Sequence, residues 1–265
     1  MKKGMNEFGI PKGLTREEEF RMLAEAGFEG VELNLDEPLT EAELKELKEL
    51  SEKYGVKVLG FVANKLWSYH LTSNDAANRE EAKNLVKMLI THAEYMGCDS
   101  VLVVPGVVNG QTSYLQAWEN ASRALCELKP FICEHKVTVC IENVWNKFLT
   151  SAFDMAKFVD EIDCEYVKCY FDAGNVLLWA YPEYWVEILG ERIKKVHIKD
   201  FRRAVGNLDG FVGLMEGDMD WKRLMESLRA VGYEGFVTVE VPYYGDAPDL
   251  FIRNCSAQLD RIFSL

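Results

Sequence analysis

The sequence predicts an α/β protein whose strands close into a (β/α)8 barrel, and three observations support this prediction. The chain has 265 residues, and such a barrel takes about 250. Helical segments alternate with short β-branched runs, which indicates parallel strands joined by crossover helices. The segment GIPKGLT, at the first strand–helix turn, lacks the GxGxxG fingerprint of the rival open sheet, and no GxxxxGK[ST] occurs.

The first elements show the pattern. A first strand is expected within Gly4–Gly9, and Thr15–Ala26 has apolar residues at helical spacing with acidic residues in its first turn. The helix Thr40–Lys53 opens with Thr40 and Glu43, which have the spacing of a capping box. The other expected strands are 30–35, 56–63, 100–104, 137–142, 166–172, 193–200 and 236–241. The other expected helices are 76–96, 112–134, 152–159, 182–189, 221–231 and 247–263.

Glycines mark where several of these helices end. Gly27, Gly55 and Gly97 each follow a helical segment and precede a β-branched run. Glycine suits this position because it adopts the left-handed conformation at a helix end without steric cost. Eight strands then alternate with eight helices, and no linker or low-complexity segment interrupts them, which predicts a single domain over residues 1–265.

Composition narrows the choice of partners. The chain carries 30 basic and 43 acidic residues, a net charge of −13. A protein that neutralises phosphates needs a basic surface, so nucleic acid is not expected as a partner. Hydrophobic residues make up 48% of the chain, enough to fill a large core.

The cysteines and the N-terminus indicate a cytoplasmic protein. Seven cysteines are scattered without a CxxC pair, which is unlike the disulfide framework of a small secreted domain. No apolar segment follows the N-terminal lysines, and no apolar run approaches the roughly 18 residues of a membrane-spanning helix. We therefore expect no membrane association.

Acidic residues and a histidine stand near the ends of four successive expected strands. In the strand 137–142, alternation turns the β-branched residues toward the helices and Glu142 toward the barrel axis. The same reasoning turns Asp172, His197 and Glu240 inward. Active sites of such barrels lie where the strands end, so these four side chains are expected to converge.

Three carboxylates that close together repel one another unless a cation or a proton neutralises them. Carboxylate oxygens with one imidazole suit a divalent ion, so one Mn²⁺ per chain is expected, with Co²⁺, Mg²⁺ or Zn²⁺ as alternatives. A single glutamate at a strand end is usually a cap or an ion-pair partner. Four such residues on successive strands favour the metal site Glu142, Asp172, His197 and Glu240.

With these residues in place, the chain resembles the xylose isomerase-like TIM-barrel superfamily of sugar and sugar-phosphate isomerases and epimerases. The matching segments are GFEGVEL, LTSNDAANREEA, IEN, FDAGN, VHIKDFR, MEGDMDW and GYEGFVTVEV. The resemblance implies that the four residues above are the metal ligands and that Glu142 and Glu240 are the catalytic acid/base pair. It also implies a carbohydrate substrate and a homodimer or homotetramer.

The chemistry implied is proton transfer next to a carbonyl. A divalent metal stabilises the developing enediolate as a Lewis acid. One glutamate removes the proton, and the other returns a proton from the opposite face of the substrate, which inverts the carbon. This predicts a ketose epimerase or an aldose–ketose isomerase.

Five further residues are expected to contact the substrate. Arg203 matches a substrate-binding arginine of the ketose 3-epimerases, with an ordinary loop charge as the alternative. Lys199 shares the inward face with His197, whereas His70 and Trp145 lie on loops after expected strand ends. The fifth residue is Asn175.

The chain departs from the free-ketose 3-epimerases at two positions. Those enzymes carry a histidine where this chain has Asn175 and a glutamate where it has Phe148. The form DxGN instead resembles the sugar-phosphate epimerase branch.

Three other functions stay open. An inosose-type dehydratase would use the same site to eliminate water. An abasic-site endonuclease is disfavoured for two reasons. Such enzymes hold a metal cluster with several histidines, whereas this chain has only four in all, and its net charge is −13. A non-catalytic sugar-binding barrel would be expected to have lost a ligand, and all four are present.

Overall fold

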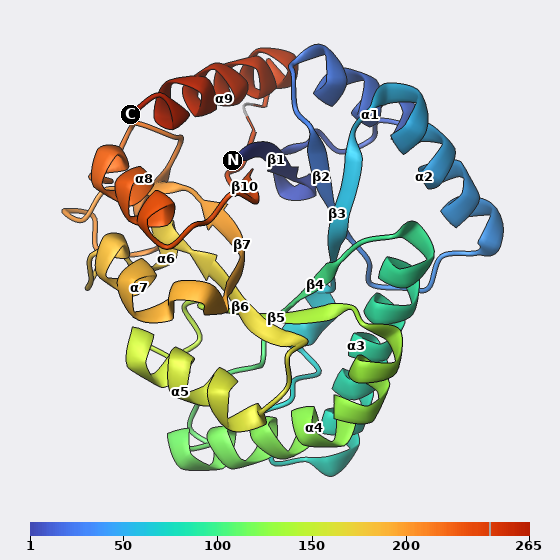
Figure 1. Cartoon of the computed structure of the whole chain (residues 1–265), viewed down its shortest axis with the longest axis vertical. Helices are drawn as coiled ribbons and strands as arrows, with labels where there is room; N and C mark the ends of the chain where they lie inside the picture. The colour runs from blue at the N-terminus through green and yellow to red at the C-terminus, as the bar shows by residue number, and fades with distance from the viewer. Residues whose placement is uncertain (244) are drawn as a thin grey trace. The chain divides into compact units, whose positions relative to one another are not determined.

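The computed structural model describes residues 1–243 and 245–265. Its main sheet is a closed barrel of parallel strands with helices around it, which confirms the predicted (β/α)8 class (Figure 1). The strands follow the order β1-β10-β7-β6-β5-β4-β3-β2 around the barrel. Each crossover helix returns the chain so that all barrel strands run the same way.

The strands and helices alternate along the chain. The barrel strands are β1 (Lys2–Asn6), β2 (Gly30–Asn34), β3 (Lys57–Val62), β4 (Ser100–Val103), β5 (Thr138–Glu142), β6 (Val167–Asp172), β7 (Ile193–Ile198) and β10 (Phe236–Val239). The helices are α1 (Arg16–Glu25), α2 (Glu41–Tyr54), α3 (Ala76–Met96), α4 (Tyr114–His135), α5 (Ala152–Ile162), α6 (Ala173–Val176), α7 (Pro182–Leu189), α8 (Trp221–Ala230) and α9 (Pro248–Phe263).

Local structure departs from the sequence prediction at three places. The first strand begins at Lys2 and ends at Asn6, because the Asn6 side chain caps a 3-10 turn, Glu7–Gly9, that replaces the rest of the expected strand. The expected strand 193–200 is divided: β7 ends at Ile198, and β8 (Asp200–Phe201) pairs antiparallel with β9 (Phe211–Val212). The one-turn helix α6 was not predicted.

The chain divides into two compact units. One comprises 1–33, 45–59 and 172–265, and the other comprises 34–44 and 60–171, so the boundaries fall inside β2, α2, β3 and β6. The single-domain organisation therefore stays a prediction.

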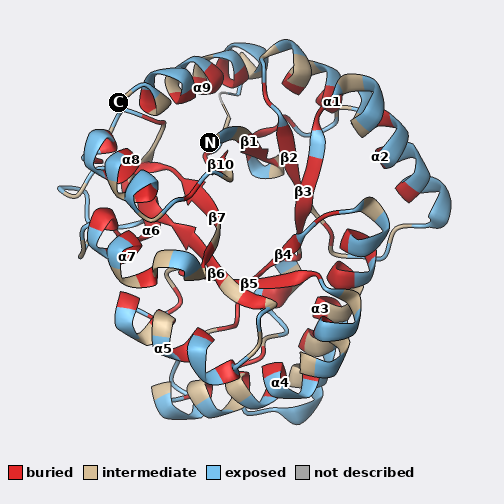
Figure 2. Ribbon diagram, viewed as in Figure 1, coloured by how far each residue is buried: buried red, intermediate tan, exposed pale blue. Residues whose placement is uncertain are grey.

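In the first unit, the strand register places Gly4, Thr238 and His197 at one level of the sheet. Gly4 of β1 pairs with Thr238 of β10, and Thr238 pairs with His197 of β7. Paired residues point to the same face, so the predicted inward direction of His197 is consistent with this register. Figure 2 shows buried residues along the strands and on the inner sides of the helices, with exposed residues on their outer sides.

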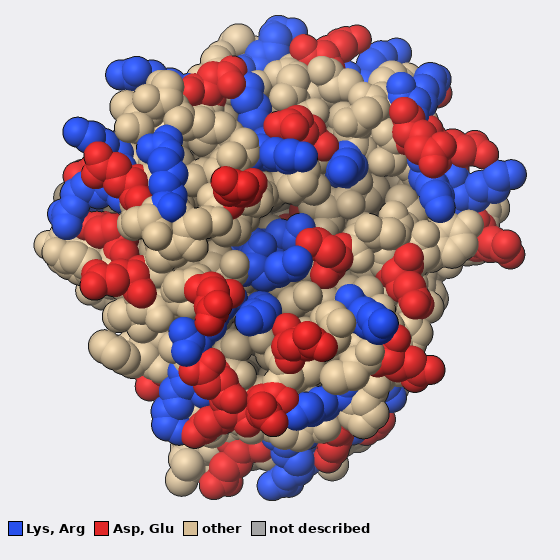
Figure 3. Space-filling model, viewed as in Figure 1, with Lys and Arg blue, Asp and Glu red and all other residues tan. Residues whose placement is uncertain are grey.

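Charged side chains cover the exterior. On the face in Figure 3, acidic and basic side chains are interspersed. None of the helices in the described part of the chain is long and apolar enough to cross a membrane.

In the second unit, an aromatic cluster joins the helices α4 and α5. The rings of Tyr114 and Trp118 lie 5.4 and 6.3 Å from the ring of Phe148, measured between centroids. Phe158 lies 5.6 Å from Phe148 and 5.2 Å from Trp118. Edge-to-face pairs at these distances add to the free energy gained from apolar burial.

Replacing Phe158 by alanine is expected to lower the free energy of unfolding by about 3–5 kcal/mol, because it leaves a cavity in this cluster. Urea unfolding measures the change. Phe153→Ala on the same helix is the matched control: Phe153 is 73% exposed, and its loss should change stability by less than about 0.5 kcal/mol. Equal effects of the two substitutions would contradict the assigned core.

Candidate metal centre

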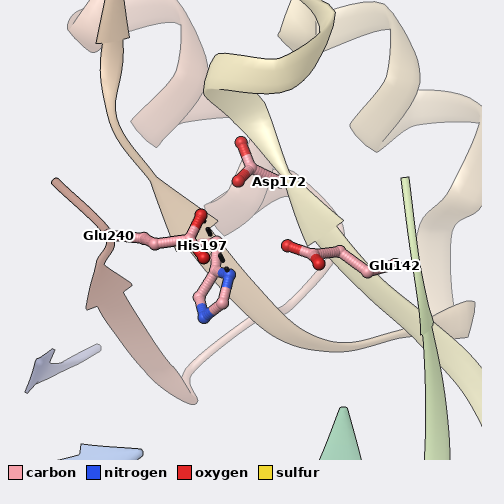
Figure 4. Close-up of side chains that lie close together, drawn as sticks. All are labelled: Glu142, Asp172, His197 and Glu240. Carbon is pink, nitrogen blue, oxygen red and sulfur yellow. Dashed lines mark ion pairs between the residues drawn. The ribbon is translucent and has the colours of Figure 1, made fainter. Parts of the chain in front are cut away.

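The ends of the barrel strands position the four residues predicted as metal ligands. Glu142 and Asp172 are the last residues of β5 and β6, His197 lies one residue before the end of β7, and Glu240 directly follows β10. Each offers one ligand atom, and these atoms all lie within 4.8 Å of one another. Figure 4 shows the Glu240 carboxylate beside the imidazole of His197.

Asp172 has a second task, which accounts for the spacing of FDAGN. Its Oδ1 accepts a hydrogen bond of 2.8 Å from the backbone N–H of Asn175, so Asp172 is the N-cap of α6. An aspartate in this position satisfies an N–H group that the helix itself leaves unpaired. The cap fixes the carboxylate, and its other oxygen, Oδ2, faces Lys199.

Lys199 is the cation of the site. Its Nζ forms ion pairs with Asp172 Oδ2 and with Glu240 Oε2, and the side chain is almost fully buried. The ammonium also lies 5.4 Å from the centroid of the Phe211 ring, on β9. The predicted inward direction of Lys199 agrees with these contacts, but its predicted contact with substrate is untested.

The pKa values of the two carboxylates beside Lys199 are shifted in opposite directions. Burial raises the pKa of Asp172, and the neighbouring charge of Glu240 adds to the rise. Burial also acts to raise the pKa of Glu240, but Lys199 and His197 outweigh it, so the pKa of Glu240 is lowered. Two acids that share one cation divide in this way because both cannot ionise without cost.

This donor set fits a divalent cation. Lys199 supplies one positive charge beside Asp172 and Glu240, whereas the group holds three carboxylates. Carboxylate oxygens with an imidazole nitrogen are ligands that Mn²⁺, Co²⁺, Zn²⁺ or Mg²⁺ accepts. Glu142, Asp172, His197 and Glu240 are the residues that would hold it.

One further buried residue at this site was not predicted from the sequence. Glu32, on β2, accepts a hydrogen bond from His197, with 2.8 Å between Oε2 and Nε2. The alternation that turned the four expected ligands inward also applies to the strand GVELNL. Applied there, it would have raised Glu32 as a candidate.

Asp200 links the segments VHIKDFR and MEGDMDW through hydrogen bonds. Its Oδ1 accepts hydrogen bonds from the backbone N–H groups of Phe201 and Met219, at 2.8 and 3.0 Å. Gly217 allows this approach, because a Cβ there would collide with the Asp200 carboxylate. The VHIKDFR and MEGDMDW segments therefore meet through one buried acid.

Arg203 holds a loop of the protein itself. Its Nε donates to the carbonyl oxygen of Leu177 at 2.8 Å, and its Nη2 donates to that of Ala180 at 3.3 Å. The guanidinium carbon lies 5.0 Å from the centroid of the Tyr181 ring. These contacts match the alternative reading of a loop charge, and the predicted contact of Arg203 with substrate stays a prediction.

The remaining expected substrate contacts lie on loops or helix ends after the strands. Asn175 is buried in the first turn of α6, and Trp145 is half-buried after β5. His70 Nδ1 lies 3.0 Å from Thr72 Oγ1, and burial lowers the pKa of His70. A contact with substrate is untested for all three.

The family follows from a comparison with known sequences. The model of the xylose isomerase-like TIM barrel matches residues 20–258. The chain therefore belongs to this family.

Its relatives include sugar 3-epimerases. A fructoselysine 3-epimerase of Shigella flexneri is 26% identical over 96% of this chain and 95% of its own length. The L-ribulose-5-phosphate 3-epimerase UlaE of S. flexneri serotype 5b is 23% identical over 90% of this chain and 86% of its own length.

Solved structures share the fold. A D-psicose 3-epimerase determined in the presence of D-fructose superposes with a TM-score of 0.81 at 16% identity and covers both chains fully. A D-tagatose 3-epimerase-like protein gives a TM-score of 0.83 at 21% identity, over 100% of this chain and 98% of its own.

Gly174→Ala is expected to destabilise the protein by about 1–3 kcal/mol through overpacking. A Cβ at Gly174 would meet Lys199 Cγ and would lie 2.7 Å from the Lys199 carbonyl oxygen, which is backbone and cannot rotate away. Thermal unfolding measures the effect. Gly110→Ala, where a Cβ meets nothing within 4 Å, is the matched control and should change stability by less than about 0.5 kcal/mol.

Proposed function

We propose that this chain is a divalent-metal-dependent sugar epimerase or isomerase of the cytoplasm, with Mn²⁺ as the native ion. The observation that carries the proposal is the group of three carboxylates and one imidazole whose ligand atoms lie within 4.8 Å of one another. The relatives support the reaction class, because they are named as 3-epimerases of a fructosamine and of a ketose phosphate.

Glu142 and Glu240 are the proposed acid/base pair. A bound divalent ion would polarise the substrate carbonyl and so acidify the neighbouring C–H bond. One glutamate then takes the proton from that carbon, and the other delivers a proton to the opposite face. The lowered pKa of Glu240 favours its ionised form, which is the form that a general base requires.

Lys199 has a proposed role beside Glu240. Its ammonium contacts Glu240 Oε2 and Asp172 Oδ2, where it would hold a carboxylate in place or donate to a substrate oxygen. Arg203, Asn175, His70 and Trp145 are the other proposed substrate contacts. The match of Arg203 to a substrate-binding arginine of the ketose 3-epimerases supports its assignment, and the other three are proposed from their positions after the strand ends.

The native ion is tested by metal content and by stability. We expect roughly one divalent ion per chain in protein purified without chelator. Mn²⁺ at about 100 times its Kd should raise the free energy of unfolding by about 2.7 kcal/mol, because the ion binds only the folded state. Elemental analysis and thermal unfolding measure both quantities.

Asp172→Asn separates the two tasks of this residue, because asparagine also caps helices but carries no charge. The variant should fold and lose the Mn²⁺-dependent stabilisation. Asp209→Asn, at an exposed position, should retain it. A folded wild-type protein that binds no divalent ion would contradict the metal proposal.

The proton-transfer role predicts that Glu240→Gln slows exchange of a substrate C–H proton with D₂O by at least about 100-fold. NMR of the loaded enzyme with its substrate measures the exchange. Glu234→Gln, in the exposed segment before β10, should exchange at the wild-type rate. Exchange retained in Glu240→Gln would refute the assignment of this residue.

The substrate is found by the same measurement on a panel of fructosamines, ketose phosphates, free ketoses and inososes. Deuterium marks the carbon that reacts, and the product identifies the reaction. An epimer or an isomer would support the proposal. A dehydrated product would instead assign the inosose-type dehydratase.

A further inference from the structure

A hydrogen-bonded group outside the predicted ligand set holds the imidazole of His197. Glu32 Oε2 lies 2.8 Å from His197 Nε2 and 2.7 Å from Asn6 Nδ2. Glu32, His197 and Asn6 are 2%, 0% and 3% exposed. In such a dry setting a charged hydrogen bond is strong, and a broken one is costly.

The barrel leaves space for this contact. His197 is on β7 and Glu32 is on β2, with β10 and β1 between them in the strand order. At the level of His197 these two strands carry Thr238 and Gly4. A Cβ at Gly4 would lie only 2.6 Å from Thr238 Oγ1. A side chain at position 4 therefore has no room, and its absence leaves the space for this contact.

The direction of each hydrogen bond follows from the groups involved. Asn6 Oδ1 accepts from the backbone N–H of Phe8 at 2.8 Å, which turns the Asn6 amide so that its NH₂ faces Glu32. The Glu32 carboxylate can only accept, so Nε2 of His197 must donate its proton. When an ion takes the place of the second proton, this hydrogen bond leaves the Nδ1 lone pair for the ion, on the side of Glu240.

We propose that Glu32 is a positioning residue that sets the tautomer of His197, so that Nδ1 faces the candidate ion with its lone pair. Nδ1 is the nitrogen on the ligand side, 3.8 Å from Glu240 Oε2 (Figure 4). The role toward an ion rests on the proposed function. Carboxylates that orient metal-binding histidines in this way commonly set metal affinity by about 10–100-fold.

The tautomer is measured directly on the wild-type protein loaded with diamagnetic Zn²⁺. The chain has four histidines, so ¹⁵N-labelled imidazoles give few NMR signals, and His197→Gln identifies the signals of His197. We expect a proton on Nε2 and none on Nδ1. The reverse tautomer, with the proton on Nδ1, would overturn the proposal.

Metal affinity gives an independent test, with Co²⁺ as the probe and its visible absorption as the signal. Glu32→Ala should weaken Co²⁺ binding by about 10–100-fold. Glu32→Gln should weaken it less, because one amide oxygen can accept both hydrogen bonds. Glu25→Ala, an exposed glutamate on α1, is the matched control and should bind Co²⁺ as the wild type does.

The outcomes separate this inference from the proposed function. A folded Glu32→Ala variant with wild-type Co²⁺ affinity would overturn the positioning role. If Glu32→Ala does not fold, Glu32→Gln and the tautomer of the wild type decide. A wild-type protein that binds neither Co²⁺ nor Zn²⁺ would contradict the proposed function and, with it, the role of Glu32 toward an ion.

Discussion

The site is organised around one ammonium between two carboxylates. Asp172 and Glu240 approach each other because their strands end at the same edge of the sheet, and two buried negative charges would oppose that approach. Lys199 directly follows β7, the strand between theirs, and offsets the repulsion through an ion pair with each. The pKa of Asp172 is raised and that of Glu240 is lowered, which follows from the same repulsion between the two acids.

Backbone groups hold these charges in place. Asp172 caps α6, and Asp200 accepts the N–H groups of Phe201 and Met219. Each acid thus holds the backbone of the segment that follows its strand, and the strand in turn sets the position of the acid. Reacting groups built on such rigid supports need little reorganisation when a substrate arrives.

The fold and the four-residue cluster could be predicted because both follow from local periodicity. Alternation along a strand decides which side chains face the axis, and Glu142, Asp172, His197 and Glu240 needed no other information. The same alternation would have shown Glu32 facing the axis, but its hydrogen bond to a residue 165 positions away in the sequence is reported by no local pattern. The hydrogen bonds from Arg203 to two backbone carbonyl oxygens could not be predicted either, because the sequence does not indicate which backbone group accepts a hydrogen bond.

Phe148 shows a different limit of sequence reasoning. At its position the free-ketose 3-epimerases carry a glutamate, and this chain departs from them there. In the structure its side chain is 1% exposed and belongs to the aromatic cluster with Trp118 and Phe158. The residue serves packing, and the cluster accounts for its type.

The close approach of Gly174 to Lys199 has an evolutionary consequence. Any other residue at position 174 would place a Cβ against the stem and the carbonyl oxygen of Lys199. The two positions are therefore epistatic: a side chain at 174 becomes tolerable only after the backbone near 199 has moved. Descendants of this chain that keep the lysine are thus constrained to keep the glycine as well.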